Sequence, residues 1–289
     1  MVKKIVLYAV LIILMIICLY PFLYIINISL SDSHEVTNGA VYLIPKGINF
    51  NAFKVIFRTS TIWRGYFNSL LYVTVGTVMT ILLCSSAGYV LSVKDYKYRK
   101  VIMAYFAVTM FFSGGIIPTF LVIRSLGLID SIWAVTIPGA LSAWTIILFR
   151  TNFKYIPKDI IDSARIDGAG HFWIYARIIM PLSKSIIATL GLFTIVAYWN
   201  SYFPALMYLT SDYKQPLMII LRKLVITDNV RGEMESIIGS AIKADMNGIG
   251  FSRSIKMASM LLSLGPIIFI YPMIQKYFER GVLVGSIKE

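Results

Sequence analysis

Residues 5–30 read IVLYAVLIILMIICLYPFLYIINISL and contain no Asp, Glu, Lys or Arg. About 20 apolar residues in a helix cross the hydrocarbon core of a bilayer, which is about 30 Å thick. Inside hydrocarbon the backbone must satisfy its own hydrogen bonds, and a helix does so within one segment. The stretch is longer than a signal-peptide core of about 7–15 residues, and no small-x-small cleavage site closes it. The sequence therefore predicts a retained membrane helix.

Five further apolar runs share this character, and none contains a charged residue. They cover residues 65–93, 101–123, 131–149, 185–211 and 257–275. The strands of a membrane barrel would be about 10 residues long with alternating polarity, which these runs are not. We predict an all-α membrane protein with six transmembrane helices in a single domain covering residues 1–289.

The charge of the chain also favours a membrane protein. It has 289 residues, 58% of them hydrophobic, and a mean hydropathy of +0.76. The net charge of +13 lies in the segments between apolar runs, whereas nucleic-acid binding needs a clustered basic face. No nucleic-acid partner is expected. Cys18, Cys84, His34 and His171 show no metal-ligand spacing, so no metal site is expected either.

The distribution of basic residues predicts the orientation. Cytoplasmic loops carry an excess of Lys and Arg close to the membrane. The short segment 94–100 carries three lysines and an arginine, while its counterpart on the other side, 124–130, carries Arg124 alone. We therefore expect both termini in the cytoplasm. Outer loops then cover 31–64 and 212–256, and the cytoplasm holds the loop 150–184 and a tail, 275–289.

The loop 150–184 is the most informative polar segment. Its centre reads IPKDIIDSARIDGAGHFWIYARIIMPLSK from Ile156 to Lys184. Pro157 suits a helix start, and from Lys158 the apolar and charged residues repeat with helical spacing. Gly168 and Gly170 permit a sharp turn, after which Phe172–Met180 is apolar-rich and ends at Pro181. We predict a helix, a turn and a short helix at the inner membrane surface. From the residues alone, a connector that caps the bundle and an elbow that docks into a partner are equally favoured.

This segment resembles the EAA loop of bacterial ABC-importer permeases. That motif runs Glu-Ala-Ala, three residues, Gly, nine residues, Ile-x-Leu-Pro. The chain has Asp162-Ser163-Ala164, then Gly168, then Ile178-Ile179-Met180-Pro181, so every spacing fits, and Asp162 keeps the acidic charge of Glu. The embedded Asp167-Gly168-Ala169 is also typical of sugar permeases.

The resemblance implies that the loop forms a coupling helix, roughly Arg165–Tyr175, seated in a cleft of an ATP-binding subunit. It would transmit ATP-driven closure to the helix bundle as a rigid-body movement. The residues that the resemblance assigns to this coupling are Asp162, Ser163, Ala164, Arg165, Asp167, Gly168, Ala169 and Pro181.

Other stretches extend the resemblance over the whole chain, to the MalG-like permeases of maltose-type, binding-protein-dependent carbohydrate importers. Phe112–Thr119, FSGGIIPT, is similar to a third-helix signature of an oligosaccharide-importing branch. Gln275, Lys276 and Tyr277, with Phe278, Gly281 and Gly285, resemble a C-terminal tail that reaches the ATPase interface.

A further stretch, Trp199–Phe203, resembles the Trp-Asn segment of the fifth helix. Trp199, Asn200 and Tyr202 are candidates for contact with a sugar by stacking and hydrogen bonding, and packing between helices is the favoured interpretation of these residues.

The function expected from the resemblance is that of a non-enzymatic permease subunit in a type I ABC importer of the bacterial cytoplasmic membrane. The cargo would be an oligosaccharide or polysaccharide fragment. The expected partners are a second homologous permease, two ABC ATPases, an extracytoplasmic solute-binding protein and the lipid bilayer. The chain lacks a Gly-x-x-x-x-Gly-Lys-Ser/Thr loop, so ATP and Mg are expected in the ATPases and no cofactor in this chain.

Three alternatives stay open at this point. An ABC-importer permease with a peptide, amino-acid or lipid-linked cargo would share the loop. A stand-alone secondary carrier would usually carry an intramembrane carboxylate or lysine, which the six runs lack. An intramembrane enzyme would need paired carboxylates, a metal cluster or a nucleophile beside a base, and no such pattern occurs.

Overall fold

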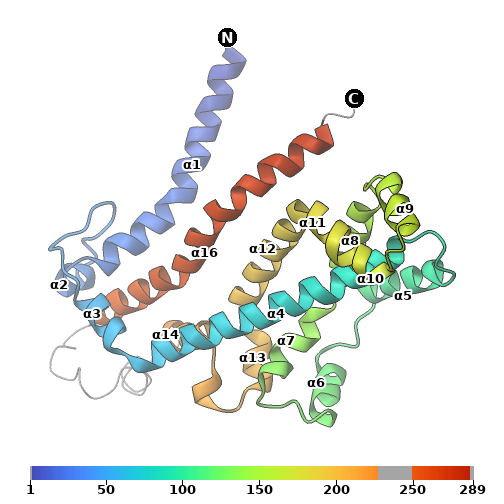
Figure 1. Cartoon of the computed structure of the whole chain (residues 1–289). Helices are drawn as coiled ribbons and strands as arrows, with labels where there is room; N and C mark the ends of the chain where they lie inside the picture. The colour runs from blue at the N-terminus through green and yellow to red at the C-terminus, as the bar shows by residue number, and fades with distance from the viewer. Residues whose placement is uncertain (1, 227–248, 287–289) are drawn as a thin grey trace. The chain divides into compact units, whose positions relative to one another are not determined.

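The computed structural model describes residues 2–226 and 249–286, and every regular element in these ranges is helical (Figure 1). Three helices are long and apolar enough to cross a membrane, over Lys3–Ser29, Ser60–Ser92 and Gly250–Ile270. Three pairs of shorter helices pass the same test as bent spans, so the described part holds three to six candidate spans. The fold class is therefore helical and membrane-compatible.

The chain forms two compact units. The first comprises Met1–Phe67 with Pro216–Pro266, and the second comprises Asn68–Gln215 with Ile267–Glu289. Two long helices, α4 (Ser60–Ser92) and α16 (Ile249–Ser286), contribute to both.

The first unit contains α1 (Val2–Ser29) and three shorter helices of the predicted outer loops. These are α2 (Ser33–Thr37), α3 (Asn51–Arg58) and α14 (Leu217–Ile226). Asp32 caps α2 by accepting a hydrogen bond from the His34 amide at 2.9 Å. Ile28, Val36 and Val41 form a small buried cluster against Met257 of α16, which holds the C-terminal end of α1 to this segment.

The second unit contains the remaining helices, and three of the apolar runs are broken within it. The helices are α5 (Arg99–Phe111), α6 (Ile116–Ser125), α7 (Ile132–Ala140), α8 (Ala143–Phe153), α9 (Lys158–Ile166), α10 (His171–Ile174), α11 (Met180–Leu182), α12 (Lys184–Asn200) and α13 (Phe203–Tyr208). A π-helical turn, η1 (Tyr175–Ile179), and a 3₁₀ turn, η2 (Asp212–Lys214), complete it.

One continuous helix per run was the expectation, and the run 101–123 departs from it most. The axes of α5 and α6 differ by 118° (Figure 1). The break lies at residues 112–115, where Gly115 adopts φ 83°, a left-handed conformation that glycine adopts without steric cost. Ser113, Gly114 and Gly115 thus lie in a sharp bend of the chain and not in a continuous helix.

The runs 131–149 and 185–211 are also divided. Leu141 and Ser142 are extended between α7 and α8, which bend by 49°, and the Ser142 hydroxyl caps α8 by accepting from the Thr145 amide at 3.3 Å. Between α12 and α13, Ser201 is extended. Pro204 has no N–H to continue a helical ladder from Asn200, which accounts for this break.

The core of the second unit lies where α4 meets α8. Cys84 and Phe149 are fully buried there, in a cluster that also includes Ile146, Ile174 and Ile179. Gly88 permits the approach, since a Cβ at this position would lie 2.8 Å from Phe149 Cβ and 3.0 Å from the Arg150 amide nitrogen. Arg150 Nε donates to the Leu91 carbonyl at 3.1 Å and so caps the C-terminal end of α4.

A polar junction fixes the opposite end of this unit. Asp130, in the αL region at φ 58°, accepts hydrogen bonds from the Ser211 amide at 3.0 Å and the Ser211 hydroxyl at 2.7 Å. Lys214 Nζ lies 2.7 Å from the same carboxylate. These hydrogen bonds, the one from Lys214 above all, hold the pKa of Asp130 well below its usual range. The junction ties the loop after α6 to the segment after α13.

Candidate functional site

The loop predicted to contact a partner begins with α9, whose inner face is anchored in the core. Ala164 is buried and Ile161 packs against the cluster around Phe149. Asp162 and Arg165 form an i,i+3 ion pair at 3.7 Å on the outer face. Being exposed, this pair adds little stability. The helix is thus held by its apolar side and presents its charged side outward.

The turn after α9 depends on one glycine. Gly168 adopts φ 82°, and its amide donates to the Arg165 carbonyl at 3.0 Å, while the Ala169 amide donates to the Ala164 carbonyl at 2.9 Å. This pair of bonds is a Schellman motif, which closes a helix and reverses the chain. Gly170 has an ordinary φ of −72°, so only Gly168 needs glycine's conformational freedom.

The second half of the loop is fixed to α4. The Ser85 and Tyr175 hydroxyls lie 2.7 Å apart, and Tyr89 Oη lies 3.3 Å from His171 Nδ1. The helix begins at His171 and continues two residues past Met180, through the π-helical turn η1 into α11. Pro181 cannot donate to the preceding turn, and the widened turn comes directly before it. The chain then bends by 81° into α12.

Large apolar side chains at the tip of this loop are exposed. Ile166 is 87% exposed, Phe172 81% and Trp173 52%. We call these three residues the apolar tip. Exposed apolar side chains gathered beside polar ones mark sites of protein–protein contact. Sequence reasoning placed all three within or beside the coupling segment, but their exposure is known only from the fold.

The residues assigned to coupling take different positions in this loop. Asp162, Ser163, Arg165, Asp167 and Gly168 are exposed along the outer side of α9 and its turn. Ala164 is buried, Ala169 is half-buried and Pro181 is exposed at the far end of the loop. The loop therefore brings the first seven of these residues together, and separates Pro181 from them.

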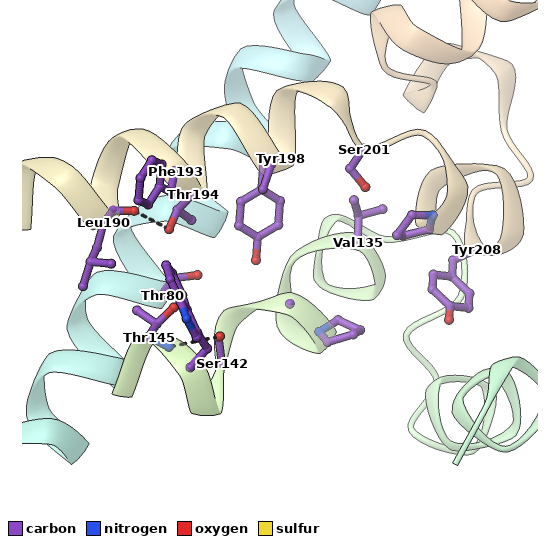
Figure 2. Close-up of a pocket in the computed structure, with 15 residues that line it drawn as sticks. Thr80, Val135, Ser142, Thr145, Leu190, Phe193, Thr194, Tyr198, Ser201 and Tyr208 are labelled. Atoms are coloured by element: carbon purple, nitrogen blue, oxygen red, sulfur yellow. Dashed lines mark hydrogen bonds between the residues drawn. The ribbon is translucent and has the colours of Figure 1, made fainter. Parts of the chain in front are cut away.

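A cavity of about 420 Å³ lies between α4, α7, α8, α12 and α13 (Figure 2). Figure 2 shows the Tyr198 side chain projecting from α12 into its middle. Tyr198 Oη donates to the Thr136 carbonyl at 2.8 Å, across the helix junction. Gly76 and Gly139 leave room for this ring, because a Cβ at either position would approach it to 2.5 or 3.0 Å.

The lining of this cavity is aromatic and hydroxyl-rich. Trp144 and Phe193 form a tilted ring pair with centroids 6.2 Å apart. The hydroxyl-bearing residues are Thr80, Ser142, Thr145, Thr194, Tyr198, Ser201 and Tyr208, and none of the described lining residues is charged. Aromatic faces with a few hydroxyl groups suit an uncharged ring bearing hydroxyls. Its volume lies in the usual range for small-molecule sites.

The fifth-helix residues singled out from the sequence lie beside this cavity but do not line it. Trp199 is buried, 4% exposed, while Asn200 and Tyr202 are exposed. Tyr198 and Ser201 line the cavity from the same stretch. The helix breaks at Ser201, so the residues of this stretch that face the cavity differ from those that a continuous helix would present. Gln275 is exposed on α16, and the side chains of Lys276 and Tyr277 lie outside the described part.

Relatives of known function decide the family. No family model matches the chain. It is 37% identical over 286 residues to the polygalacturonan/rhamnogalacturonan transport system permease protein YtcP of Bacillus subtilis, covering 97% of this chain and 96% of the relative. The crystal structure of a bacterial ABC transporter for import of the acidic polysaccharide alginate contains a chain with 33% identity and a TM-score of 0.89, covering 96% of both chains. This chain belongs to the permease subunits of carbohydrate ABC importers.

The chain is also similar to a second protein of the same organism. The permease is 34% identical to protein LplC of Bacillus subtilis over 272 residues, with 94% of this chain and 90% of the relative covered. The permease is accordingly a membrane transport subunit and not an enzyme, as its sequence predicted.

Proposed function

We propose that this permease forms half of the translocation pathway of an ATP-driven importer of acidic oligosaccharides, and that its 158–182 loop is the coupling element. The observation that carries the coupling role is the apolar tip, held outward by the Schellman turn. A loop that is anchored in the core and exposes Ile166, Phe172 and Trp173 at its tip suits insertion into a cleft of an ATPase subunit.

The anchoring of the loop supports its use as a lever. Its first helix packs through Ala164 and Ile161 into the α4–α8 core, and its second half bonds to α4 through Tyr175. A push on the tip would therefore move α4 and α8 together, because packed interfaces shift as bodies rather than deform. Alternating access by rocking of such a body exposes a central site to each side in turn.

The complete assembly that we propose has a second homologous permease, two ABC ATPases holding ATP and Mg, and an extracytoplasmic binding protein. Six spans with both termini in the cytoplasm put the loop on the ATPase side. Gln275, Lys276 and Tyr277 of α16 would lie at the same interface. Support for the binding protein comes from the alginate importer, which was crystallised with a periplasmic protein bound to an alginate pentasaccharide.

The acidic cargo is inferred from two relatives. One is a permease for polygalacturonan and rhamnogalacturonan, and the other belongs to an importer of the acidic polysaccharide alginate. The cavity around Tyr198 would accept sugar rings by stacking and hydroxyl contacts, with the carboxylates held elsewhere along the path. Asn200 and Tyr202, both exposed, are the candidates next to it.

Reconstitution of the assembled transporter in proteoliposomes tests this function. Uptake of a labelled oligogalacturonate should require ATP, the ATPases and the binding protein, and should exceed uptake of a neutral maltooligosaccharide of equal length. Deletion of Asp167–Gly170 should abolish uptake while the chain remains in the membrane. Equal uptake of both sugars would contradict the acidic cargo, and ATP-independent uptake would contradict the ABC mechanism.

Trp173→Ala tests the docking role directly, with Trp133→Ala as its matched control. Both tryptophans are about half exposed, at 52% and 45%, but Trp133 belongs to α7 and not to the loop. If Trp173 anchors the ATPase, its truncation should weaken assembly by at least about 2 kcal/mol, or roughly 30-fold. Loss of ATPase co-purification in Trp173→Ala alone is the expected result; equal retention in both variants would refute the role.

A further inference from the structure

A second cavity, of about 530 Å³, is surrounded by five basic side chains from separate segments of the second unit. They are Lys94 after α4, Arg99 at the start of α5, Lys154 at the end of α8, and Lys158 and Arg165 on α9. We call this cavity the basic pocket. None of the apolar tip residues lines it, although Asp162 and Arg165, which the resemblance assigns to coupling, lie in its wall.

Positive charge exceeds negative charge among the residues that line this pocket. Two carboxylates are present, and that of Asp162 is 3.7 Å from Arg165 Nη1. The neighbouring Lys158 ammonium lowers the pKa of Lys94, and Asp95 opposes this only weakly. Burial, followed by the charges of Arg150 and Arg99, lowers the pKa of Lys154 as well. The basic side chains around the pocket thus repel one another, and an anion in the pocket would relieve that repulsion.

One wall of the pocket is apolar. Val93 and Phe153 line it from the ends of α4 and α8, and Ile156 and Ile161 continue this surface. The helix α4 is a candidate span, and α7 with α8 is a bent one, so their ends lie where a bilayer would present its headgroups. A ligand matched to both walls carries a compact negative group next to an apolar part. Basic pockets of this kind beside membrane helices bind lipid headgroups.

We propose that the basic pocket binds the phosphate group of an anionic phospholipid, with Lys94 and Lys158 as its closest cationic contacts. The acyl chains would leave along Val93 and Ile161 toward the bilayer. Occupation would bridge the loop after α4 to α9, and so brace the base of the coupling loop. The site does not depend on the identity of the cargo.

The experiment compares two double variants of the assembled transporter that remove equal charge. Lys94→Gln with Lys158→Gln changes the pocket. Lys97→Gln with Lys100→Gln changes two nearby exposed lysines that do not line it, one in the loop after α4 and one in the first turn of α5. Each complex is purified in mild detergent, and retained phosphatidylglycerol is measured by native mass spectrometry. Binding of added short-chain phosphatidylglycerol is then titrated, first alone and then with inorganic phosphate as competitor.

The pocket variant should bind phosphatidylglycerol roughly 30-fold more weakly, about fivefold for each lysine, while the control stays close to wild type. Replacing Lys94 and Lys158 by Arg should restore binding, which would show that folding is intact. Equal loss in both Gln variants would overturn the pocket in favour of general surface charge. Displacement of phosphatidylglycerol by millimolar inorganic phosphate would overturn the lipid as the ligand and favour a free phosphate. Loss of the ATPases with lipid retained would overturn the proposal in favour of a protein contact.

Discussion

The turn at Gly168 offers the sharpest test of the coupling loop, because a substitution there strains the backbone without disturbing any side-chain contact. Gly168 has φ 82°, and a Cβ built on it meets no atom within 4 Å. Gly168→Ala therefore causes no steric clash with the rest of the chain. Its whole cost is the strain of an L-residue in the left-handed region.

That strain is about 1–2 kcal/mol for an alanine. It acts on the equilibrium between the folded turn and an opened loop in which the two Schellman hydrogen bonds are lost. Since about 1.4 kcal/mol corresponds to a factor of ten, the population of the closed turn relative to the open one should fall roughly 5- to 30-fold. Asn tolerates this conformation better than Ala, so Gly168→Asn should have a smaller effect.

The assay is ATP-driven uptake by the reconstituted transporter, with binding of the ATPases measured in parallel. Gly168→Ala should reduce both, and Gly168→Asn should reduce them less. Gly170→Ala is the matched control, because Gly170 has an ordinary φ and also has open space around its Cβ position. If Gly168→Ala and Gly170→Ala behave alike, the left-handed turn has no part in coupling.

Three further predictions concern the second unit. Gly88→Ala places a methyl group 2.8 Å from Phe149 Cβ and should destabilise the α4–α8 contact by about 1–3 kcal/mol, seen as a lower Tm in detergent. Tyr198→Phe removes the hydrogen bond to the Thr136 carbonyl and should cost about 0.5–1.5 kcal/mol by the same measurement, while changing uptake if the cavity holds cargo. The lowered pKa of Asp130 means that its stabilising contribution is complete above its unfolded pKa of about 4, and fades as the pH falls toward the lower folded value. Asp130→Asn should therefore lower the Tm at neutral pH and remove this acid dependence.

Controls for these variants come from the same chain. Gly191→Ala is the match for Gly88→Ala, because a Cβ at Gly191 meets no atom within 4 Å and should leave the Tm unchanged or slightly higher. An equal loss at Gly191 would remove close packing as the cause of the Gly88 effect. An acid-induced fall in Tm that persists in Asp130→Asn would assign the pH dependence to other carboxylates.

The sequence by itself determined where helices can cross a bilayer and which family the chain resembles. Freedom from charge over a run such as 5–30 is a local property, and the lipid solvent permits only a helix there. The spacing from Asp162 through Gly168 to Pro181 is likewise visible in the sequence alone. Gly168 was correctly expected to turn the chain, because few residues tolerate a left-handed backbone. Six spans and the orientation stay predictions.

Only the tertiary structure decided how those runs break and what they surround. An apolar composition does not distinguish a straight helix from the 118° bend at 112–115. Such a bend leaves backbone N–H and C=O groups without helical partners, and whether neighbouring segments satisfy them depends on the tertiary structure. The cavity around Tyr198 gathers side chains from α4, α7, α8, α12 and α13, and Ser201, between the last two helices, is extended. Lys94 and Lys158 come together from segments that are far apart in the sequence. Such convergence arises from packing between distant segments, which no local pattern records.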